Sequence, residues 1–284
     1  TNFTVSQVEA MALFGSATWS PIESLDISVG LRYSNEEQEA RQVKTSFLET
    51  ADGTDIIELG TFSFFEFVDG RLLAEEFFDD REDDAFTPSA SVLWRATDNV
   101  NLFFGYAEGF NSGGFNLALD AALEDSRTFG PEGVKSYDLG VRSTWFDGRL
   151  VANATVYFLQ YDDIQRFVEV GTGIGAVTNA AQAEGEGIEA EFSYQFNDHL
   201  DFFGAFGYQK TELTEFVDFF GRDLSGNSLA FAPEITGAAG FQYERPISTW
   251  GDVFVGSTAQ YRDETFFNDN NEPDEVSTDA WIVN

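Results

Sequence analysis

The sequence of 284 residues contains no cysteine, one histidine and one methionine, and its 15 basic residues are outnumbered by 50 acidic ones. The lack of cysteine and the single histidine exclude disulfide scaffolds, thiolate or histidine-rich metal sites and Cys/His catalysis. The formal net charge of -35 excludes nucleic acid as a partner, because the phosphate backbone would be repelled. No run of about 18 apolar residues occurs, which excludes a transmembrane helix.

Aromatic and hydrophobic residues are abundant instead. The chain has 31 Phe, 9 Tyr and 5 Trp, and 43% of its residues are hydrophobic, so the high charge does not indicate disorder. Apolar and polar residues alternate with a period of two from end to end, which is typical of β-strands with two different faces. About eleven such strands can be counted, and they predict an all-β fold.

The two faces of these strands differ in a way that is informative about the solvent. One face is apolar, nearly free of charge, and often ends in an aromatic residue: Trp19, Tyr33, Trp94, Tyr106, Trp145, Tyr194, Tyr208, Tyr243 and Tyr261. The other face is small, polar and rich in glycine, unlike the charged face of a soluble sandwich. The pattern predicts a lipid-facing band with aromatic girdles around a wet interior. Hydrocarbon is therefore expected to contact Leu25, Phe104, Leu139 and Phe206.

The connections between strands alternate in length. Short turns are expected at residues 20–24, 97–99, 146–149 and 196–199, with a somewhat longer one at 244–251. Asp147-Gly148 is a strong signal for a two-residue hairpin. Long polar segments lie at about 45–83, 110–133, 164–182, 212–231 and 264–276. This alternation predicts an antiparallel up-and-down meander with tight turns at one edge and long loops at the other.

The strand count predicts an open sheet. Single-chain bacterial barrels close with an even number of strands, and residues 280–284 read as the middle of a strand. We therefore interpret residues 1–284 as one partial barrel domain, an internal fragment whose two edge strands are unpaired.

Residues 106–116 (YAEGFNSGGFN) resemble the strand-to-loop segment of TonB-dependent outer-membrane receptors. Further stretches are similar to the same family in the same order: 13–19, 29–33, 86–91, 131–140, 179–181, 187–189, 232–234 and 282–284. The resemblance implies a bacterial outer-membrane β-barrel of about 22 strands, of which this chain would cover roughly strands ten to twenty. It implies contact with outer-membrane lipid and TonB-dependent import of a bulky scarce ligand, most often a ferric siderophore. It implies no enzymatic activity and no cofactor. The plug domain and the segment that recruits TonB would lie outside this fragment.

The ligand site is predicted in the same motif. Aromatic rings and amides suit a siderophore-like ligand, and the motif offers four of them: Phe110, Asn111, Phe115 and Asn116. Alternatively the motif only shapes the strand-to-loop transition, which its glycines at 109, 113 and 114 favour.

Two groups of acidic residues offer other chemistry. Glu189 and Glu191 share one strand face, about 6.6 Å apart by strand rise. Paired carboxylates can cleave glycosides, but lumenal acids that tune a channel or contact a plug are the favoured interpretation. The dense acidic run from Asp69 to Asp84 could form a cation-attracting vestibule, whereas a charged external loop is favoured.

Three further features have a plain structural interpretation. The glycine-rich residues 171–176 superficially resemble a nucleotide-binding loop, but a flexible external loop is favoured. Residues 268–275 could ligate a hard cation through oxygen atoms, but they lack the EF-hand spacing, which favours a solvated loop. His199 is expected to be a turn residue. We predict no catalytic residue and no metal site.

Other functions remain open at this stage. A passive porin would need no plug domain. A soluble, secreted acidic β protein that binds or cleaves glycans would suit the net charge but not the apolar, aromatic-bounded face. A surface adhesin or autotransporter barrel would be smaller and carry a separate passenger.

Overall fold

The computed structural model describes residues 2–49, 56–60, 75–117, 127–171, 174–218, 220–248 and 251–284. In order, its strands are β1 (Asn2–Ile22), β2 (Leu25–Glu49), β3 (Ile56–Gly60), β4 (Glu75–Thr97), β5 (Val100–Asn111), β6 (Gly114–Phe115), β7 (Thr128–Phe129), β8 (Glu132–Trp145), β9 (Leu150–Gly171), β10 (Ile174–Asn197), β11 (Leu200–Phe216), β12 (Ile235–Ser248), β13 (Gly251–Arg262), β14 (Thr265–Phe266), β15 (Val276–Ser277) and β16 (Ala280–Val283). No helix long and apolar enough to cross a membrane occurs in the described residues.

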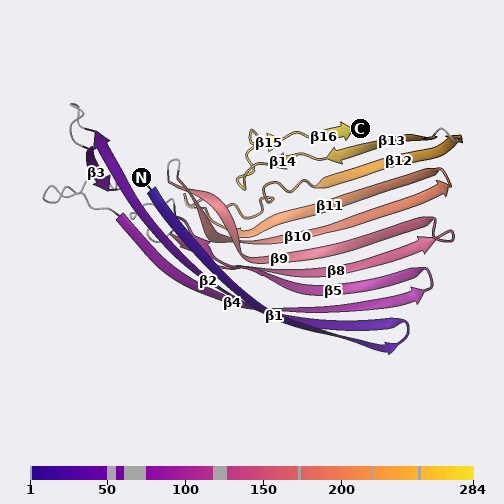
Figure 1. Ribbon diagram of the computed structural model, residues 1–284, viewed down its shortest axis with the longest axis horizontal. Helices are drawn as coiled ribbons and strands as arrows, with labels where there is room; N and C mark the ends of the chain where they lie inside the picture. The colour runs from indigo at the N-terminus through magenta and orange to yellow at the C-terminus, as the bar shows by residue number, and fades with distance from the viewer. Residues whose placement is uncertain are drawn as a thin grey trace.

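One curved, open sheet contains nearly all of these strands (Figure 1). Its order is β1-β2-β4-β5-β8-β9-β10-β11-β12-β13-β16, with β3 pairing β2 off this path. Every neighbouring pair is antiparallel, and β1 and β16 are the two edges among the described strands. The predicted all-β antiparallel meander is therefore confirmed.

The tight turns all lie at one end of the sheet, as predicted (Figure 1). Two residues join β4 to β5 and β10 to β11, because Thr97 pairs with Val100 and Asn197 pairs with Leu200. His199 lies in the second of these turns, as expected. The short turn predicted at residues 146–149 is confirmed, because Trp145 pairs with Leu150; its loop has four residues and not the two that Asp147-Gly148 signals.

The predicted long loops were wrong in their bounds, because the strands continue into them. β2 and β4 stay paired from Leu25↔Trp94 as far as Lys44↔Glu75. Residues 75–84 of the acidic run are consequently strand rather than external loop, and residues 69–74 lie outside the described residues. Residues 171 and 174–176 likewise belong to β9 and β10 instead of a flexible loop. Beyond the apolar band both faces of a strand can be polar, so the alternation disappears although the backbone ladder continues.

The two faces of the sheet match the sequence pattern. On the apolar face, Phe104, Leu139 and Phe206 are 44%, 57% and 48% exposed, while Leu25 is half-buried. None of them lies in a sealed interior, as a sandwich would require. Cross-strand pairs such as Phe104↔Leu139 join these residues into a continuous apolar surface.

Candidate functional site

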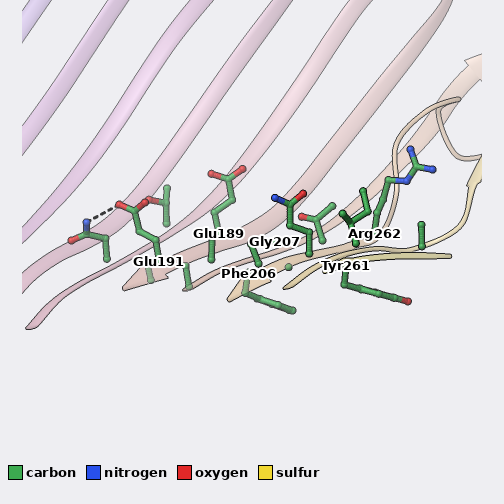
Figure 2. A pocket seen from close by; sticks show the side chains of 17 residues that line it. Glu189, Glu191, Phe206, Gly207, Tyr261 and Arg262 are labelled. Atoms are coloured by element: carbon green, nitrogen blue, oxygen red, sulfur yellow. Dashed lines mark hydrogen bonds between the residues drawn. The ribbon is translucent and has the colours of Figure 1, made fainter. Parts of the chain in front are cut away.

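A groove of about 760 Å³ lies on the polar face, over β9 to β13 and β16 (Figure 2). Glu189 and Glu191 of β10 and Arg262 of β13 point to one side, whereas Phe206 and Tyr261 point to the other. The hollow side of this part of the sheet is therefore the polar one, and we call it the lumen face.

The floor of this groove is made of small residues between charged ends. Pairing places Glu189, Gly207, Thr236 and Arg262 in one row across four strands. Glu191 accepts a hydrogen bond from Asn153 Nδ2 at 2.9 Å. Both glutamates lie on the same face, as predicted, and both are exposed to an open groove.

A second cavity of about 550 Å³ lies where β4 and β5 separate. These strands pair only up to Ser89↔Ala107. Beyond that point β4 continues beside β2 and β5 continues beside β8. We call this opening the fork. Its cavity is lined by β1, β2, β4 and β5, and it includes the predicted site residues Phe110 and Asn111.

The other two predicted residues lie elsewhere. The backbone groups of Val177 bind both ends of the Asn116 amide, at 2.7 and 2.8 Å. Phe115 meets the ring of Phe77 edge-on, 6.2 Å between centroids. Asn111 is held by Glu132 and Gln165, to which it donates at 3.3 and 3.1 Å. The structure thus brings only Phe110 and Asn111 into one cavity.

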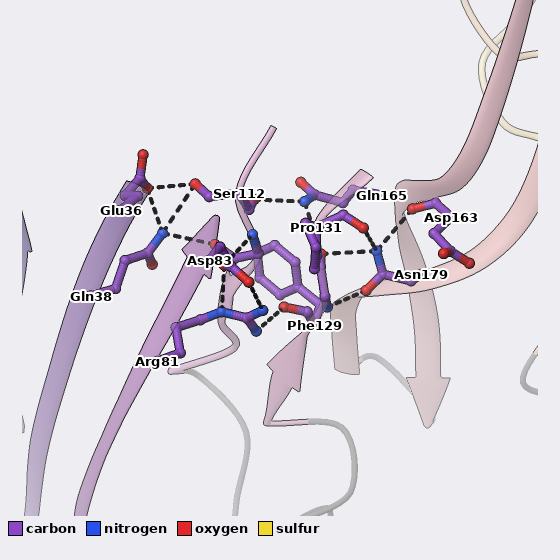
Figure 3. A network of polar contacts seen from close by, with 12 residues as sticks. Glu36, Gln38, Arg81, Asp83, Ser112, Phe129, Pro131, Asp163, Gln165 and Asn179 are labelled. Carbon is purple, nitrogen blue, oxygen red and sulfur yellow. Dashed lines mark hydrogen bonds and ion pairs between the residues drawn. The ribbon is translucent and has the colours of Figure 1, made fainter. Parts of the chain in front are cut away.

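Residues 112–117 and 127–131, which we call the strap, cross from one side of the fork to the other (Figure 3). Its short strands β6 and β7 pair with each other through Gly114↔Phe129 and Phe115↔Thr128. Polar side chains of the long strands bind its backbone on both sides. The strap therefore joins the two sides of the fork, which no β-ladder connects beyond the pair Ser89↔Ala107.

On the β2 and β4 side, three side chains bind the backbone of the strap. Gln38 donates to Gly113 O at 2.8 Å, and Gly113 N donates to Asp83 Oδ2 at 3.0 Å. Arg81 donates to Phe129 O and is paired with Asp83, with 2.6 Å between Nη2 and Oδ1. Asp83 is almost fully buried, so its charge is balanced inside this contact.

On the opposite side, two amides hold the strap. Gln165 of β9 donates from Nε2 to Ser112 O at 2.7 Å and to Gly130 O at 3.0 Å. Asn179 of β10 donates to Gly130 O at 2.9 Å and accepts from Gly130 N. Both amides come from segments that the sequence predicted as loops. No local pattern identifies them, because their partners lie 35 to 53 residues away.

The connections after β11 and β13 form a compact cap at the outer end of β9 to β11. It covers a small apolar core: Ile164, Ala181, Ala183, Leu213, Phe216 and Leu224. Arg166 of β9 makes a two-pronged ion pair with Asp269, and Asp269 also accepts from Ala230 N at 3.0 Å. Residues 268–275, for which a solvated loop was favoured over a cation site, form a turn region whose Asp269 is bound to arginine. In the described residues, no group of three or more acidic or histidine side chains could hold a metal ion.

Asp218 is a second carboxylate of this cap that is held by several hydrogen bonds. Its side chain is 8% exposed, and burial raises the pKa of its carboxyl group. Hydrogen bonds from the backbone and guanidinium of Arg222 and from Phe220 N outweigh this effect, so the pKa is lowered. The charged form of Asp218 therefore stabilises the folded connection.

Comparison with known proteins places this geometry in a family. Residues 1–284 match the family model described as TonB dependent receptor-like, beta-barrel. A ferric-pyoverdine receptor of Pseudomonas sp. is 29% identical over 133 residues, which are 46% of this chain and 15% of that protein. A metal-pseudopaline receptor of Pseudomonas aeruginosa is 29% identical over 132 residues, 46% of this chain and 17% of that protein.

Solved structures share the fold. The ferric yersiniabactin uptake receptor FyuA from Yersinia pestis superposes with a TM-score of 0.76 at 17% identity, over 99% of this chain and 38% of that one. The siderophore receptor PiuA from Acinetobacter baumannii gives 0.72 at 16% identity, over 98% and 36%. This chain thus spans well under half the length of these proteins. The relatives are receptors rather than enzymes, and they lie in the outer membrane of Gram-negative bacteria. Because the family model matches all of residues 1–284 and the sheet is an antiparallel meander, the chain belongs to the TonB-dependent receptors and forms part of the β-barrel wall of that family.

Proposed function

We propose that this chain is part of a receptor that imports a metal chelate, most specifically a ferric siderophore, across the outer membrane with energy delivered through TonB. The observation that carries the proposal is the pair of opposite faces: an exposed apolar face for lipid and a grooved polar face for the lumen. The relatives support the ligand class, because they are receptors for ferric pyoverdine, metal-pseudopaline and ferric yersiniabactin.

The outer end of the sheet suits capture of a bulky solute. The strap and the cap are folded against the long strands by many hydrogen bonds, so a defined surface faces the cell exterior. Within the fork cavity, Phe110 and Asn111 keep their proposed role in ligand binding. The side-chain amide of Asn116, in contrast, is hydrogen-bonded to the backbone of Val177, so its contribution is to hold the strap in place.

The test is uptake by iron-starved cells that carry the intact receptor as their only candidate importer. Radioactive iron supplied as a panel of ferric siderophores should enter these cells, and entry should stop when TonB is deleted or the proton gradient is collapsed. Entry that persists without TonB would identify a passive pore instead. Import of cobalamin or an oligosaccharide, with no iron chelate transported, would overturn the ligand class.

A further inference from the structure

The pairing of β9 with β10 is irregular at one place near the outer end of the sheet. The register shifts on either side of Ala181, by an extra residue in β9 on one side and an extra residue in β10 on the other. Asp163, at the first of these β-bulges, has a φ of 55°, in the left-handed region. Bulges bend a strand and increase its local twist. The part of the hairpin beyond them, residues 165–171 and 174–179, is therefore turned relative to the wall, and we call it the outer hairpin.

The outer hairpin binds the strap through two side chains that face each other across the ladder. Gln165 pairs with Asn179, and both donate to Gly130 O, at 3.0 and 2.9 Å. Asn179 also donates to the backbone carbonyl of Asp163 at 2.8 Å, as Figure 3 shows. One amide thus connects the strap to the bulge itself.

The residue that follows Gln165 binds the cap. Successive side chains of a strand point to opposite faces, so Arg166 faces away from the strap. It makes the two-pronged ion pair with Asp269, which in turn accepts from Ala230 N at 3.0 Å. The strap and the cap therefore hold opposite faces of the same two-stranded segment. A rotation of the outer hairpin that separates Gln165 from the strap also displaces Arg166 and its partner Asp269.

The strap in turn forms part of the fork cavity. Ser112 lines this cavity, and its carbonyl oxygen accepts from Gln165 at 2.7 Å. Asn111 lines it as well and donates to Gln165 Oε1 at 3.1 Å. The position of the outer hairpin therefore sets the position of one wall of the cavity.

From this geometry we propose that the strap, the outer hairpin and the cap form one cooperative unit, which moves relative to the barrel wall about the bulge at Asp163. Loosening of the cap is transmitted to the strap and to the fork cavity, and loosening of the strap is transmitted to the cap. Such coupling is reciprocal by thermodynamic necessity, which allows it to be tested from both ends. The unit is a property of the fold and does not depend on which ligand the receptor takes.

The first test starts at the cap and measures amide hydrogen exchange of the intact receptor at single-residue resolution. Asp269→Asn should accelerate exchange of the strap amides of Gly113 and Gly130 by about threefold or more, the effect expected of a weakened charged contact in a cooperative unit. These two amides report the strap because they donate to Asp83 and Asn179. Asp162→Asn is the matched control. Asp162 lies on the same strand just before the bulge and is paired with Lys135 at 2.7 Å, so its loss should leave both amides unchanged.

The second test starts at the side of the strap that is far from β9. Gln38 of β2 donates to Gly113 O at 2.8 Å. Gln38→Ala should accelerate exchange of Ala230 N in the cap by about threefold or more. A direct effect on Arg166 is excluded, because Gln38 is on another strand across the fork. Asn35→Ala is the control, since Asn35 is on the same strand but donates to Glu82 of β4 at 2.7 Å and not to the strap. It should leave Ala230 unchanged.

Two results would overturn the proposal. If Asp269→Asn accelerates exchange only in the cap and Gln38→Ala only in the strap, the two parts open independently. If Asp162→Asn or Asn35→Ala has the same distant effect, or if exchange in the ladder between β12 and β13 also accelerates, the substitutions loosen the wall in general and no separate unit exists. Acceleration at the far end of the unit in both test variants, with an unchanged β12–β13 ladder, is the result we expect.

Discussion

Arg166 and Asp269 are 103 residues apart in sequence, yet their side chains form a two-pronged ion pair at the outer end of the sheet. The Asp269 carboxylate also accepts from Ala230 N, and its backbone carbonyl accepts from Asn227 Nδ2 at 2.8 Å. One aspartate therefore joins β9 to the connections that follow β11 and β13. The adjacent residue, Gln165, holds the strap instead. The outer part of β9 is thus the point at which the strap and the cap are both fixed.

We expect Asp269→Asn to loosen the cap. The substitution removes the charge that Arg166 faces at a largely buried position, where the two side chains are 22% and 10% exposed. Loss of such a contact costs about 1–3 kcal/mol of local stability. Amide hydrogen exchange in residues 264–276 and 227–231 of the intact receptor should accelerate accordingly. Asp274→Asn is the matched control, because Asp274 is exposed in the same connection. Equal exchange in the two variants would show that the ion pair does not hold the cap.

The sheet could be predicted from sequence because its two solvents impose different side chains on alternate positions. Leu25 to Tyr33 illustrate this, with apolar residues at every second position up to the aromatic end. That signal ends where the strands leave the apolar band. The segment from Glu75 to Asp84 shows no alternation, although it pairs with β2 residue by residue. Composition alone does not separate a charged strand from a charged loop.

The fork cavity was only half predictable. Phe110 and Asn111 were found through their motif, and both line the cavity. Arg32 was not, because on its strand it is one polar residue among several. Its place in the cavity follows from the pairing with Thr87 of β4, which is 55 residues away in sequence and meets it only in the fold. Gln165 and Asn179 escaped prediction for the same reason.

We expect Gly140→Ala to destabilise the barrel wall. A methyl group at this position would meet the ring of Phe103 and lie 2.8 Å from the carbonyl oxygen of Ala154. The ring would have to leave its place under Arg142, and overpacking of this kind costs about 1–3 kcal/mol. The temperature at which the intact receptor loses its compact electrophoretic form should fall.

Gly105→Ala provides the control for this substitution. It lies on the neighbouring strand and the same face, where an added methyl group meets only Asp138 at an ordinary 3.7 Å. Its effect on the unfolding temperature should be small. If both variants unfold at the same reduced temperature, the contact with the Phe103 ring is not the cause of the destabilisation.

Phe206→Arg should impair insertion and stability. Phe206 is 48% exposed on the apolar face of β11, six residues beyond Leu200, where β11 begins. Arginine near the bilayer midplane costs about 2–4 kcal/mol in barrels of this kind. Phe206→Leu keeps the apolar contact and should fold normally. The measurement is the yield of folded receptor in isolated outer membranes. Equal yields for the two variants would mean that Phe206 does not face hydrocarbon.

The connection after β11 should open in acid. The pKa of Asp218 is lowered in the folded state, so its contribution to stability is complete above the ordinary aspartate value of 3.8 and is lost as the pH falls through the lower folded value. The pKa of Asp223 is also lowered, by the hydroxyl and backbone N–H of Ser225, and this acts in the same direction. Hydrogen exchange at Phe220, Arg222 and Leu224, corrected for the intrinsic rate, should therefore show full protection at neutral pH and falling protection below 3.8. Asp218→Asn should expose these amides already at neutral pH and leave a smaller acid response, due to Asp223. Protection that stays constant into strong acid in the unmodified protein would contradict the role of the Asp218 charge.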